Sequence, residues 1–437
     1  MRVVHYQGLD IPNHKDQTRN IGISSIPASS QLVLPLNQHH DTLLIPCVIP
    51  GQRVLAGQAI AKPAHRLGAS LHAPVSGLVR AIEPCATATS QKNTTPSIVL
   101  SNDTLAPSVT HSSTTPHWHS LSSITLCEQL ASGGIVGLGG AVFPVATKLA
   151  AHTQHPINQL IINGVECEPY ISCDDHLMQE HATEILQGTK IMMHACQTSS
   201  AIIAIEADKP EAIAAIGNRL HELNDNRIRV QVIPSTYPSG DEGQLIRHLT
   251  GQEIPHGKLP AHIGIIVSNV ATVYASARWI LHGEPLISRI VTVSGNGISK
   301  PGNYRVLLGT SMQDVLRHCG AVFKPGQRLI MGGAMMGHAL DHTGYPVIKA
   351  TNSLILADDQ ELNPVVVEQA CIRCGECAEA CPVHLLPQQL LSHARHGHKK
   401  ALQQLGLYDC IECGNCDYVC PSHIRLVTHF RRAKQVT

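Results

Sequence analysis

The sequence has few aromatic residues, no excess of charge of either sign and no long apolar run. Phe, Trp and Tyr make up 3% of its 437 residues, whereas 27 prolines and 34 glycines indicate many turns. Lys plus Arg and Asp plus Glu number 32 each, so the bulk charge argues against nucleic acid as a partner. The most apolar stretch, residues 263–281, contains Ser268, Asn269, Ser276 and Arg278, and a direct membrane span is therefore not expected.

The first ten residues, MRVVHYQGLD, lack the basic and apolar segments of a secretory leader. Of the 15 cysteines, eight lie in two tight clusters near the C-terminal end and seven are scattered. Without a leader, clustered cysteines indicate metal ligands in a reducing compartment, by default the cytoplasm, rather than disulfides. A chain of this length is expected to form three or four domains.

Both cysteine clusters follow the pattern C-x2-C-x2-C-x3-C-P, which points to iron–sulfur chemistry. Three thiolates at this spacing can hold three irons of one cubane, and in two-cluster ferredoxins the fourth cysteine ligates the other cluster. Structural zinc is the alternative, but zinc sites use two separated cysteine pairs and four ligands in all. The pattern predicts two [4Fe-4S] clusters, one on Cys371, Cys374, Cys377 and Cys420, the other on Cys381, Cys410, Cys413 and Cys416.

The segment between the two cysteine runs indicates which kind of ferredoxin module to expect. Residues 387–396 and 398–407 both have the apolar spacing of helices, with Leu390, Leu391 and Ala394 in the first. A compact ferredoxin has a short spacer with strands. The sequence therefore predicts an all-helical dicluster module.

Residues 134–144 form a glycine-rich segment before a helical run. Glycines ahead of a helix N-terminus expose amide donors for phosphate, and Lys148 lies one turn further on. A dinucleotide fingerprint would follow a strand, yet residues 127–132 look helical, so a plain turn between two helices is the alternative. The glycines alone are compatible with a phosphate-binding loop and with a plain turn.

Three polar segments follow apolar runs. Asn163, Glu166 and Glu168 come directly after a predicted strand at 160–162, where α/β proteins place ligand-binding groups. Residues 237–242 form a second acidic turn, and residues 268–272 follow the apolar run 263–267. Each segment alone also fits a solvated turn.

In their order along the chain, GLGGAVFP, INGVECEP, GDEGQLI and SNVAT resemble the nucleotide-binding core of the NADH-oxidising flavoprotein subunit of respiratory complex I. The resemblance is closer to the RnfC family of the Rnf (or Rsx) ion-translocating electron transport complex, whose members end in a dicluster region like residues 364–425. It implies three groups of site residues. Gly137, Gly139, Gly140, Ala141 and Lys148 would line FMN and its phosphate; Asn163, Glu166, Gly240, Asp241, Asn269 and Thr272 would contact flavin or ribityl; Phe143, Glu168 and Glu242 would bind NADH.

The resemblance also implies a multidomain α/β plus β fold. Its parts are a barrel-sandwich domain (1–110), an FMN- and NADH-binding α/β domain (111–285), a soluble-ligand-binding β-grasp domain (286–350) and the two-cluster ferredoxin domain (360–437). Residues 51–58 and 73–77 resemble biotinyl and lipoyl carriers, but the Met-Lys-Met of a carrier is absent around Lys62. We therefore expect no biotin or lipoate there.

The family resemblance implies an NADH-oxidising component of a translocase, peripheral on the cytoplasmic face of the bacterial inner membrane. Hydride would pass from NADH to FMN, and single electrons would pass through the clusters to or from ferredoxin and other subunits, including membrane-embedded ones. Leu138 and Ala271 depart from the complex I pattern, which has Arg and an acid at these positions. The alternatives are a ferredoxin-like adaptor with no active nucleotide site and a soluble NADH dehydrogenase of the hydrogenase diaphorase type.

Overall fold

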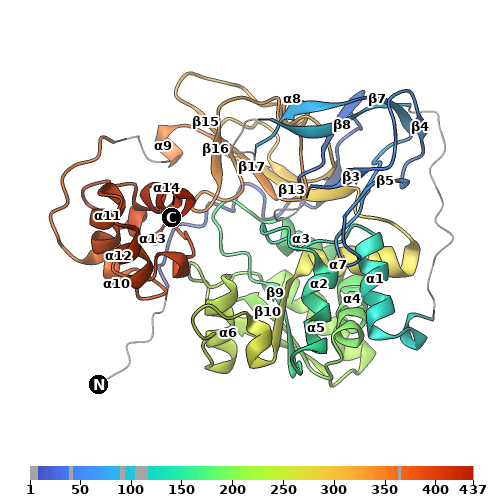
Figure 1. Cartoon of the computed structure of the whole chain (residues 1–437), viewed down its shortest axis with the longest axis horizontal. Helices are drawn as coiled ribbons and strands as arrows, with labels where there is room; N and C mark the ends of the chain where they lie inside the picture. Colours follow the sequence, from blue (N-terminus) through green and yellow to red (C-terminus); the bar gives the residue numbers. More distant parts are fainter. Residues whose placement is uncertain (1–7, 39–42, 89–93, 104–116, 363–365, 437) are drawn as a thin grey trace.

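The computed structural model describes residues 8–38, 43–88, 94–103, 117–362 and 366–436, which form four units (Figure 1). The barrel-sandwich unit (blue) and the β-grasp unit lie together on one side of the α/β unit. The helical C-terminal unit (red) lies at one end, beside α6 (Glu242–Thr250). No helix within the described ranges is long and apolar enough to cross a membrane.

The barrel-sandwich unit consists of two small sheets with the strand orders β2-β8-β7-β4 and β3-β5-β6. Leu32, Leu34 and Ile60 are fully buried in one core to which both sheets contribute. The predicted barrel-sandwich fold is thereby confirmed. The strands are β2 (Gln31–Pro35), β3 (Ile45–Pro46), β4 (Arg53–Val54), β5 (Ala59–Lys62), β6 (Leu71–His72), β7 (Gly77–Ala86) and β8 (Thr94–Asn102).

The α/β unit contains a parallel sheet with the strand order β11-β10-β9-β12. From β9 the chain winds outward through β10 and β11 and then returns to place β12 on the other side, so the strand order reverses between β9 and β12. Ligands of open α/β sheets bind at the carboxyl ends of strands at such a point. The strands are β9 (Gln159–Gly164), β10 (Ala201–Glu206), β11 (Ile228–Ile233) and β12 (Ile265–Asn269).

Helices cover both faces of this sheet (Figure 1). Most of them join its strands in one large core, and α6 packs against the strands in a second, smaller cluster. Besides α6, they are η1 (Trp118–Ser120), α1 (Ser123–Ser132), α2 (Val145–Leu149), η2 (Ala150–Thr153), α3 (Cys173–Glu180), α4 (Ala182–Ala195), α5 (Pro210–Leu223), η3 (Pro260–Ile263) and α7 (Val270–His282). The glycine-rich segment joins α1 to α2, as predicted.

The β-grasp unit is a six-stranded mixed sheet whose edge strand comes from the start of the chain. Strand β1 (Ile23–Ser25) pairs in parallel with β14, with Ile23 opposite Asn303. The other elements are β13 (Ser288–Ser294), β14 (Gly302–Leu307), α8 (Met312–His318), β15 (Arg328–Met331), β16 (His338–Leu340) and β17 (Ser353–Ala357).

Residues 366–436 contain helices and no strand, in agreement with the predicted all-helical module. Leu390, Leu391, Leu402 and Phe430 form its core. The elements of this unit and the short helix before it are α9 (Asp359–Leu362), α10 (Glu376–Glu379), α11 (Pro387–Arg395), α12 (Lys399–Gln404), η4 (Leu407–Asp409), α13 (Asn415–Tyr418) and α14 (Leu426–Val436).

Candidate flavin and iron–sulfur sites

Residues 137–143, called the glycine loop below, form a closed turn with free amide groups. The amide of Gly137 donates to the carbonyl of Phe143 (2.8 Å), and the amide of Val142 donates back to the carbonyl of Gly137 (3.1 Å). Between these two bonds, the exposed amides of residues 139–141 donate to no group in the described part of the chain. Successive free amides of this kind bind anions.

The glycine loop lies over the carboxyl ends of β9 and β12. Asn269, which ends β12, is paired with Asn163 of β9, so both amide side chains lie at the point where the strand order reverses. A Cβ atom on Gly139 would lie 3.3 Å from Cβ of Asn269, so the backbone approaches this edge closely. The side-chain amide of Asn163 donates to the carbonyl of Gly240 (2.9 Å). Predicted site residues from four segments therefore meet at this edge.

These groups fit the chemistry of FMN. Gly140 has a φ of +113° and open space around it, and the free amides beside it suit a phosphate. Asn163 and Asn269 offer polar groups at the strand ends, and Phe143, 39% exposed, offers an aromatic face. FMN contacts of Gly137, Gly139, Gly140, Ala141, Asn163, Gly240 and Asn269, and the nicotinamide contact of Phe143, remain predictions that this geometry supports.

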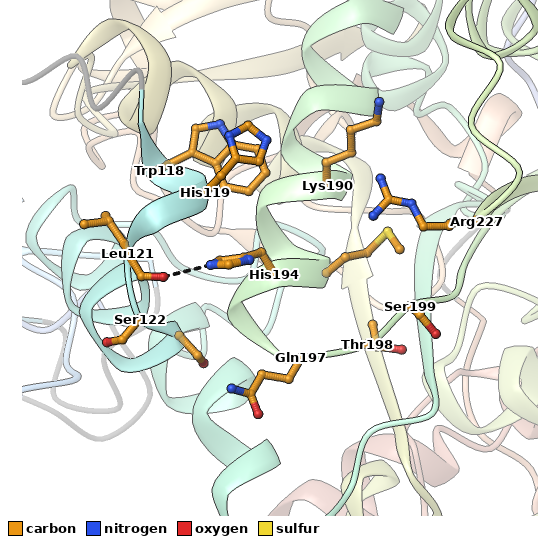
Figure 2. Close-up of a pocket in the computed structure, with 12 residues that line it drawn as sticks. Trp118, His119, Leu121, Ser122, Lys190, His194, Gln197, Thr198, Ser199 and Arg227 are labelled. Atoms are coloured by element: carbon orange, nitrogen blue, oxygen red, sulfur yellow. Dashed lines mark hydrogen bonds between the residues drawn. The ribbon is translucent and has the colours of Figure 1, made fainter.

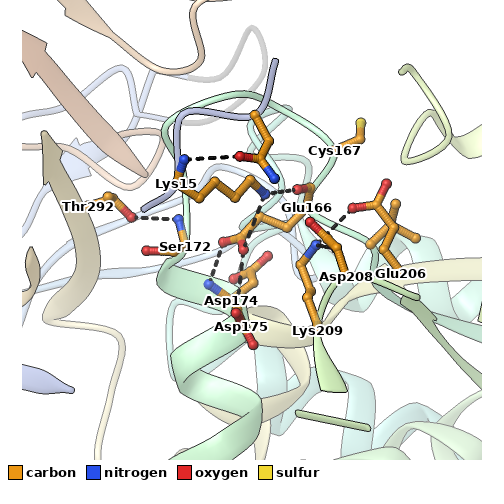
Figure 3. Close-up of polar contacts among 12 residues, drawn as sticks. Lys15, Glu166, Cys167, Ser172, Asp174, Asp175, Glu206, Asp208, Lys209 and Thr292 are labelled. Carbon is orange, nitrogen blue, oxygen red and sulfur yellow. Dashed lines mark hydrogen bonds and ion pairs between the residues drawn. The ribbon is translucent and has the colours of Figure 1, made fainter. Parts of the chain in front are cut away.

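The Glu166 side chain is buried among Lys15, Asp174 and Asp175 (Figure 3). Its carboxylate accepts hydrogen bonds from the amides of Asp174 (2.6 Å) and Asp175 (3.4 Å) at the start of α3, and Lys15 Nζ lies 3.9 Å away. Burial raises the pKa of Glu166 to about 7, and the charge of Lys15 opposes this rise. These contacts give Glu166 a structural role at the N-terminus of α3, and its flavin contact stays a prediction.

Glu168 connects the α/β unit to the β-grasp unit. Its carboxylate accepts hydrogen bonds from the amides of Met335 (3.1 Å) and Met336 (3.0 Å) in the β-grasp unit and from the Tyr237 hydroxyl (3.3 Å). Burial raises its pKa to about 7, and these hydrogen bonds oppose the rise. The geometry gives no support to the predicted NADH contact. No feature of the sequence indicates a role for Tyr237, because its hydrogen-bond partners lie far from it along the chain.

Four further predicted residues are held in local contacts. Asp241 caps α6 by accepting from the amides of Gly243 and Gln244, both at 3.0 Å. Glu242 pairs with Lys148 at 2.5 Å, and both side chains are about one-third exposed. Thr272 is fully buried, and its hydroxyl accepts a hydrogen bond from the Leu138 amide (2.8 Å). Thr272 therefore supports the glycine loop from beneath, and its flavin contact stays a prediction.

The eight cysteines line two separate cavities, in the crossed grouping that the spacing predicts. What we call the outer set, Cys371, Cys374, Cys377 and Cys420, surrounds one cavity together with apolar Leu391 and Ile424. The inner set, Cys381, Cys410, Cys413 and Cys416, surrounds the other together with Val427 and Phe430. Four converging thiols in an apolar shell fit a cubane. Ligation by these cysteines remains a prediction.

The backbone repeats along with the cysteine pattern. Arg373 and Glu412, which occupy equivalent positions in the two runs, have φ values of +61° and +58°. Gly375 and Gly414 follow with +91° and +83°. The same left-handed turns thus build both cysteine loops.

The inner set is buried and touches the flavin-side loops, whereas the outer set faces outward. Cys413 and Cys416 are buried, but Cys371 and Cys374 are exposed. The Tyr237 hydroxyl donates to the Cys413 carbonyl (2.7 Å), and Gln244 donates to the Pro382 carbonyl (3.1 Å) beside Cys381. The segment 237–244 therefore borders both candidate sites.

A cavity of about 510 Å³ opens elsewhere on the α/β unit, beside the end of α4 (Figure 2). Trp118 stacks on His119 at one wall, and Lys190 and Arg227 lie at another. Both cations pair with Asp225, at 3.1 and 2.8 Å. None of the predicted site residues lines this cavity.

Comparison with protein families identifies all four units. Residues 4–105 match the RnfC barrel sandwich hybrid domain, and residues 130–278 match the Nuo51 FMN-binding domain. Residues 290–339 match the SLBB domain, and residues 368–424 match a 4Fe-4S dicluster domain. The predicted fold class is confirmed for every unit.

A solved structure of an NAD⁺-reducing [NiFe]-hydrogenase in the H₂-reduced state is similar in fold. The TM-score is 0.52 at 18% identity, and the match covers 75% of this chain and 65% of that chain.

The similar curated proteins are named as the C component of an ion-translocating oxidoreductase complex. The protein from Pseudomonas aeruginosa is 44% identical over 98% of this chain and 55% of its own length. The one from Haemophilus influenzae is 42% identical over 98% of this chain and 52% of its own length, so the chain spans about half of these two relatives. The one from Rhodobacter capsulatus is 39% identical over 98% of this chain and 82% of its own length. Because this last match extends over most of both proteins, the chain belongs to the RnfC family of ion-translocating oxidoreductase components.

Proposed function

We propose that the chain oxidises NADH at an FMN bound by the glycine loop and passes the electrons through two [4Fe-4S] clusters. The observation that carries this proposal is the segment 237–244. It contacts Asn163 beside the glycine loop and, through Tyr237 and Gln244, the inner cysteine set. One short segment thus joins a candidate flavin site to a candidate cluster site.

The residues of the chain would bind and orient the cofactors, since the redox chemistry belongs to the cofactors themselves. A bound flavin supplies the exchange between two-electron hydride transfer and one-electron transfer. The free amides of residues 139–141 would bind the flavin phosphate, and Asn163 and Asn269 would orient polar groups at the strand ends. The exposed ring of Phe143 would stack on the nicotinamide and exclude water.

The two cysteine sets would act in a fixed order. The inner set is buried against the flavin-side segment, so its cluster would exchange electrons with the flavin site. The outer set has exposed Cys371 and Cys374, and its neighbour Ile372 is 68% exposed. That face would meet the electron-transfer partner, which we take to be ferredoxin or another component of a membrane-bound complex on the cytoplasmic face of the bacterial inner membrane.

Anaerobic reconstitution with iron, sulfide and FMN tests the proposal. We expect close to eight irons and one FMN per chain, bleaching of the flavin band on addition of NADH, and cluster signals in electron paramagnetic resonance. A chain that takes up iron but no flavin would instead be the ferredoxin-like adaptor. Flavin reduction without cluster reduction would contradict the electron route.

A further inference from the structure

Two cations from the β-grasp unit lie buried behind the glycine loop. Arg289 of β13 is 3% exposed and donates through Nη2 to the carbonyl of Leu138 (3.1 Å). Lys349 is fully buried, and its Nζ donates to the carbonyl of Gly134 (2.8 Å). Lys349 therefore holds a backbone carbonyl just before the glycine loop, and Arg289 holds one within it.

The two cations are also connected to each other and to the barrel-sandwich unit. Arg289 Nη1 donates to the carbonyl of Lys349. Lys349 Nζ donates to the carbonyl of Ser70 (3.0 Å), and its amide donates to Gln38 Oε1 (3.1 Å). A Cβ atom on Gly134 would collide with the Ser70 carbonyl oxygen, so only glycine fits there. Three units thus meet at the base of the glycine loop.

Burying a charged side chain is unfavourable unless its contacts offset the hydration that it loses. Desolvation lowers the pKa of Lys349 to about 7 and lowers that of Arg289, although the charges of Cys173 and Asp174 oppose the effect on Arg289. Apolar side chains of similar volume often replace buried charges at no loss of stability. Both side chains do something at this position that an apolar side chain could not, because they bind carbonyls, and Arg289 also places positive charge there.

We propose that Arg289 and Lys349 are positioning residues that fix the glycine loop for FMN, an inference that rests on the proposed function. Held carbonyls on the buried side leave the amides of residues 139–141 directed away from it. Positive charge behind the loop also favours an anionic phosphate and the more negative, reduced form of the flavin. The β-grasp unit would thus be a working part of the flavin site.

The test uses the full-length chain and the variants Arg289→Gln, Arg289→Lys and Lys349→Gln. Arg317→Gln is the matched control, because Arg317 lies in the same unit at 68% side-chain exposure and forms its ion pair with surface Asp314. We expect the Kd for FMN to rise about tenfold or more in Arg289→Gln and Lys349→Gln. The flavin midpoint potential should fall in Arg289→Gln, and Arg289→Lys should restore the potential more than the affinity, since Lys keeps the charge but not the paired donors.

Hydrogen exchange of the peptide 134–143 without flavin gives an independent readout. The bonded amides of Gly137, Leu138 and Val142 should exchange faster in the Arg289 and Lys349 variants than in the control. If Arg289→Gln does not fold, Lys349→Gln and Arg289→Lys decide. Folded variants with unchanged hydrogen exchange, FMN affinity and flavin potential would overturn the inference. A wild-type chain that binds no FMN would overturn the proposed function. In that case the exchange result alone would show whether Arg289 and Lys349 fix the glycine loop.

Discussion

The hydroxyl of Tyr237 donates a hydrogen bond of 2.7 Å to the carbonyl oxygen of Cys413 and lies 3.3 Å from a carboxylate oxygen of Glu168. Tyr237 is 1% exposed, so this junction excludes water. A single side chain therefore connects the loop after β9, the segment before α6 and the inner cysteine set. Its loss should separate the two candidate redox sites without removing a ligand of either.

Tyr237→Phe should slow electron transfer from the flavin site to the inner cluster while leaving flavin reduction by NADH intact. The lost hydrogen bond is worth about 1 kcal/mol, enough to loosen the contact without unfolding the chain. Stopped-flow absorbance separates the flavin and cluster phases. Tyr418→Phe, at a tyrosine that is 50% exposed, is the control and should leave both phases unchanged. Equal cluster rates in wild type and Tyr237→Phe would show that this junction is not on the route.

Cys381→Ser should disturb the cluster of the inner set and leave the outer cluster intact. The reason is that Cys381 lines the cavity of Cys410, Cys413 and Cys416, although it belongs to the other run in sequence. Cys420→Ser should have the opposite effect. Electron paramagnetic resonance of the reduced variants distinguishes the two. Damage from Cys381→Ser confined to the Cys371 cluster would rule out the crossed grouping.

Glu168→Gln should remove part of the pH dependence of stability. The pKa of Glu168 is raised from 4.5 to about 7, so the folded chain binds a proton that the unfolded chain releases between these values. Its contribution therefore falls as the pH rises from about 4.5 to about 7, by on the order of 3 kcal/mol at most. Glutamine carries no charge and lacks this dependence.

Thermal unfolding of wild type and Glu168→Gln at pH 5 and pH 8 measures this effect. The two proteins should be similar at pH 5, and the variant should gain relative to wild type at pH 8. Glu211→Gln, an exposed substitution on α5, is the control. A difference between wild type and variant that is the same at both pH values would mean that Glu168 is ionised throughout.

Glu242→Gln should reduce the preference for NADH over NADPH. The family resemblance assigns four acids to the flavin and NADH contacts. Of these, Glu166, Glu168 and Asp241 are held in internal contacts, whereas the Glu242 side chain is 37% exposed. At about 6 Å and an effective dielectric near 20, each unit pair of like charges costs roughly 2–3 kcal/mol before screening. Even about 1.4 kcal/mol is a tenfold preference.

Anaerobic bleaching of the flavin band by NADH and by NADPH, in wild type and variant, gives the ratio of the two activities. Lys148 pairs with Glu242, so Lys148→Met should strengthen the preference by exposing the carboxylate. An unchanged ratio in both variants would show that Glu242 does not face the ribose.

The sequence predicted the parts of the sites that depend on local spacing. The cysteine pattern is set within a few residues of chain, and the glycine loop closes on itself through Gly137 and Phe143. Arg289, by contrast, contacts Leu138 across 151 positions, and Glu168 contacts Met336 across 168. No local pattern marks such residues, because their partners are chosen by the packing of separate units. For the same reason, the contacts of Glu168 with the β-grasp unit and of Glu166 with the start of α3 could not be read from the sequence.

Strand β1 has a consequence for how the chain is made. Ile21, just before it, accepts a hydrogen bond from Asn303, 282 positions further on, and the strand completes the sheet edge at β14. During synthesis the start of the chain emerges from the ribosome long before its partner does. The barrel-sandwich and α/β units can pack while this segment waits, and the β-grasp sheet gains its edge only near the end of translation. A bulky tag fused ahead of residue 23 is thus expected to hinder the late pairing of β1 with β14. It should not affect the folding of the domain nearest to it.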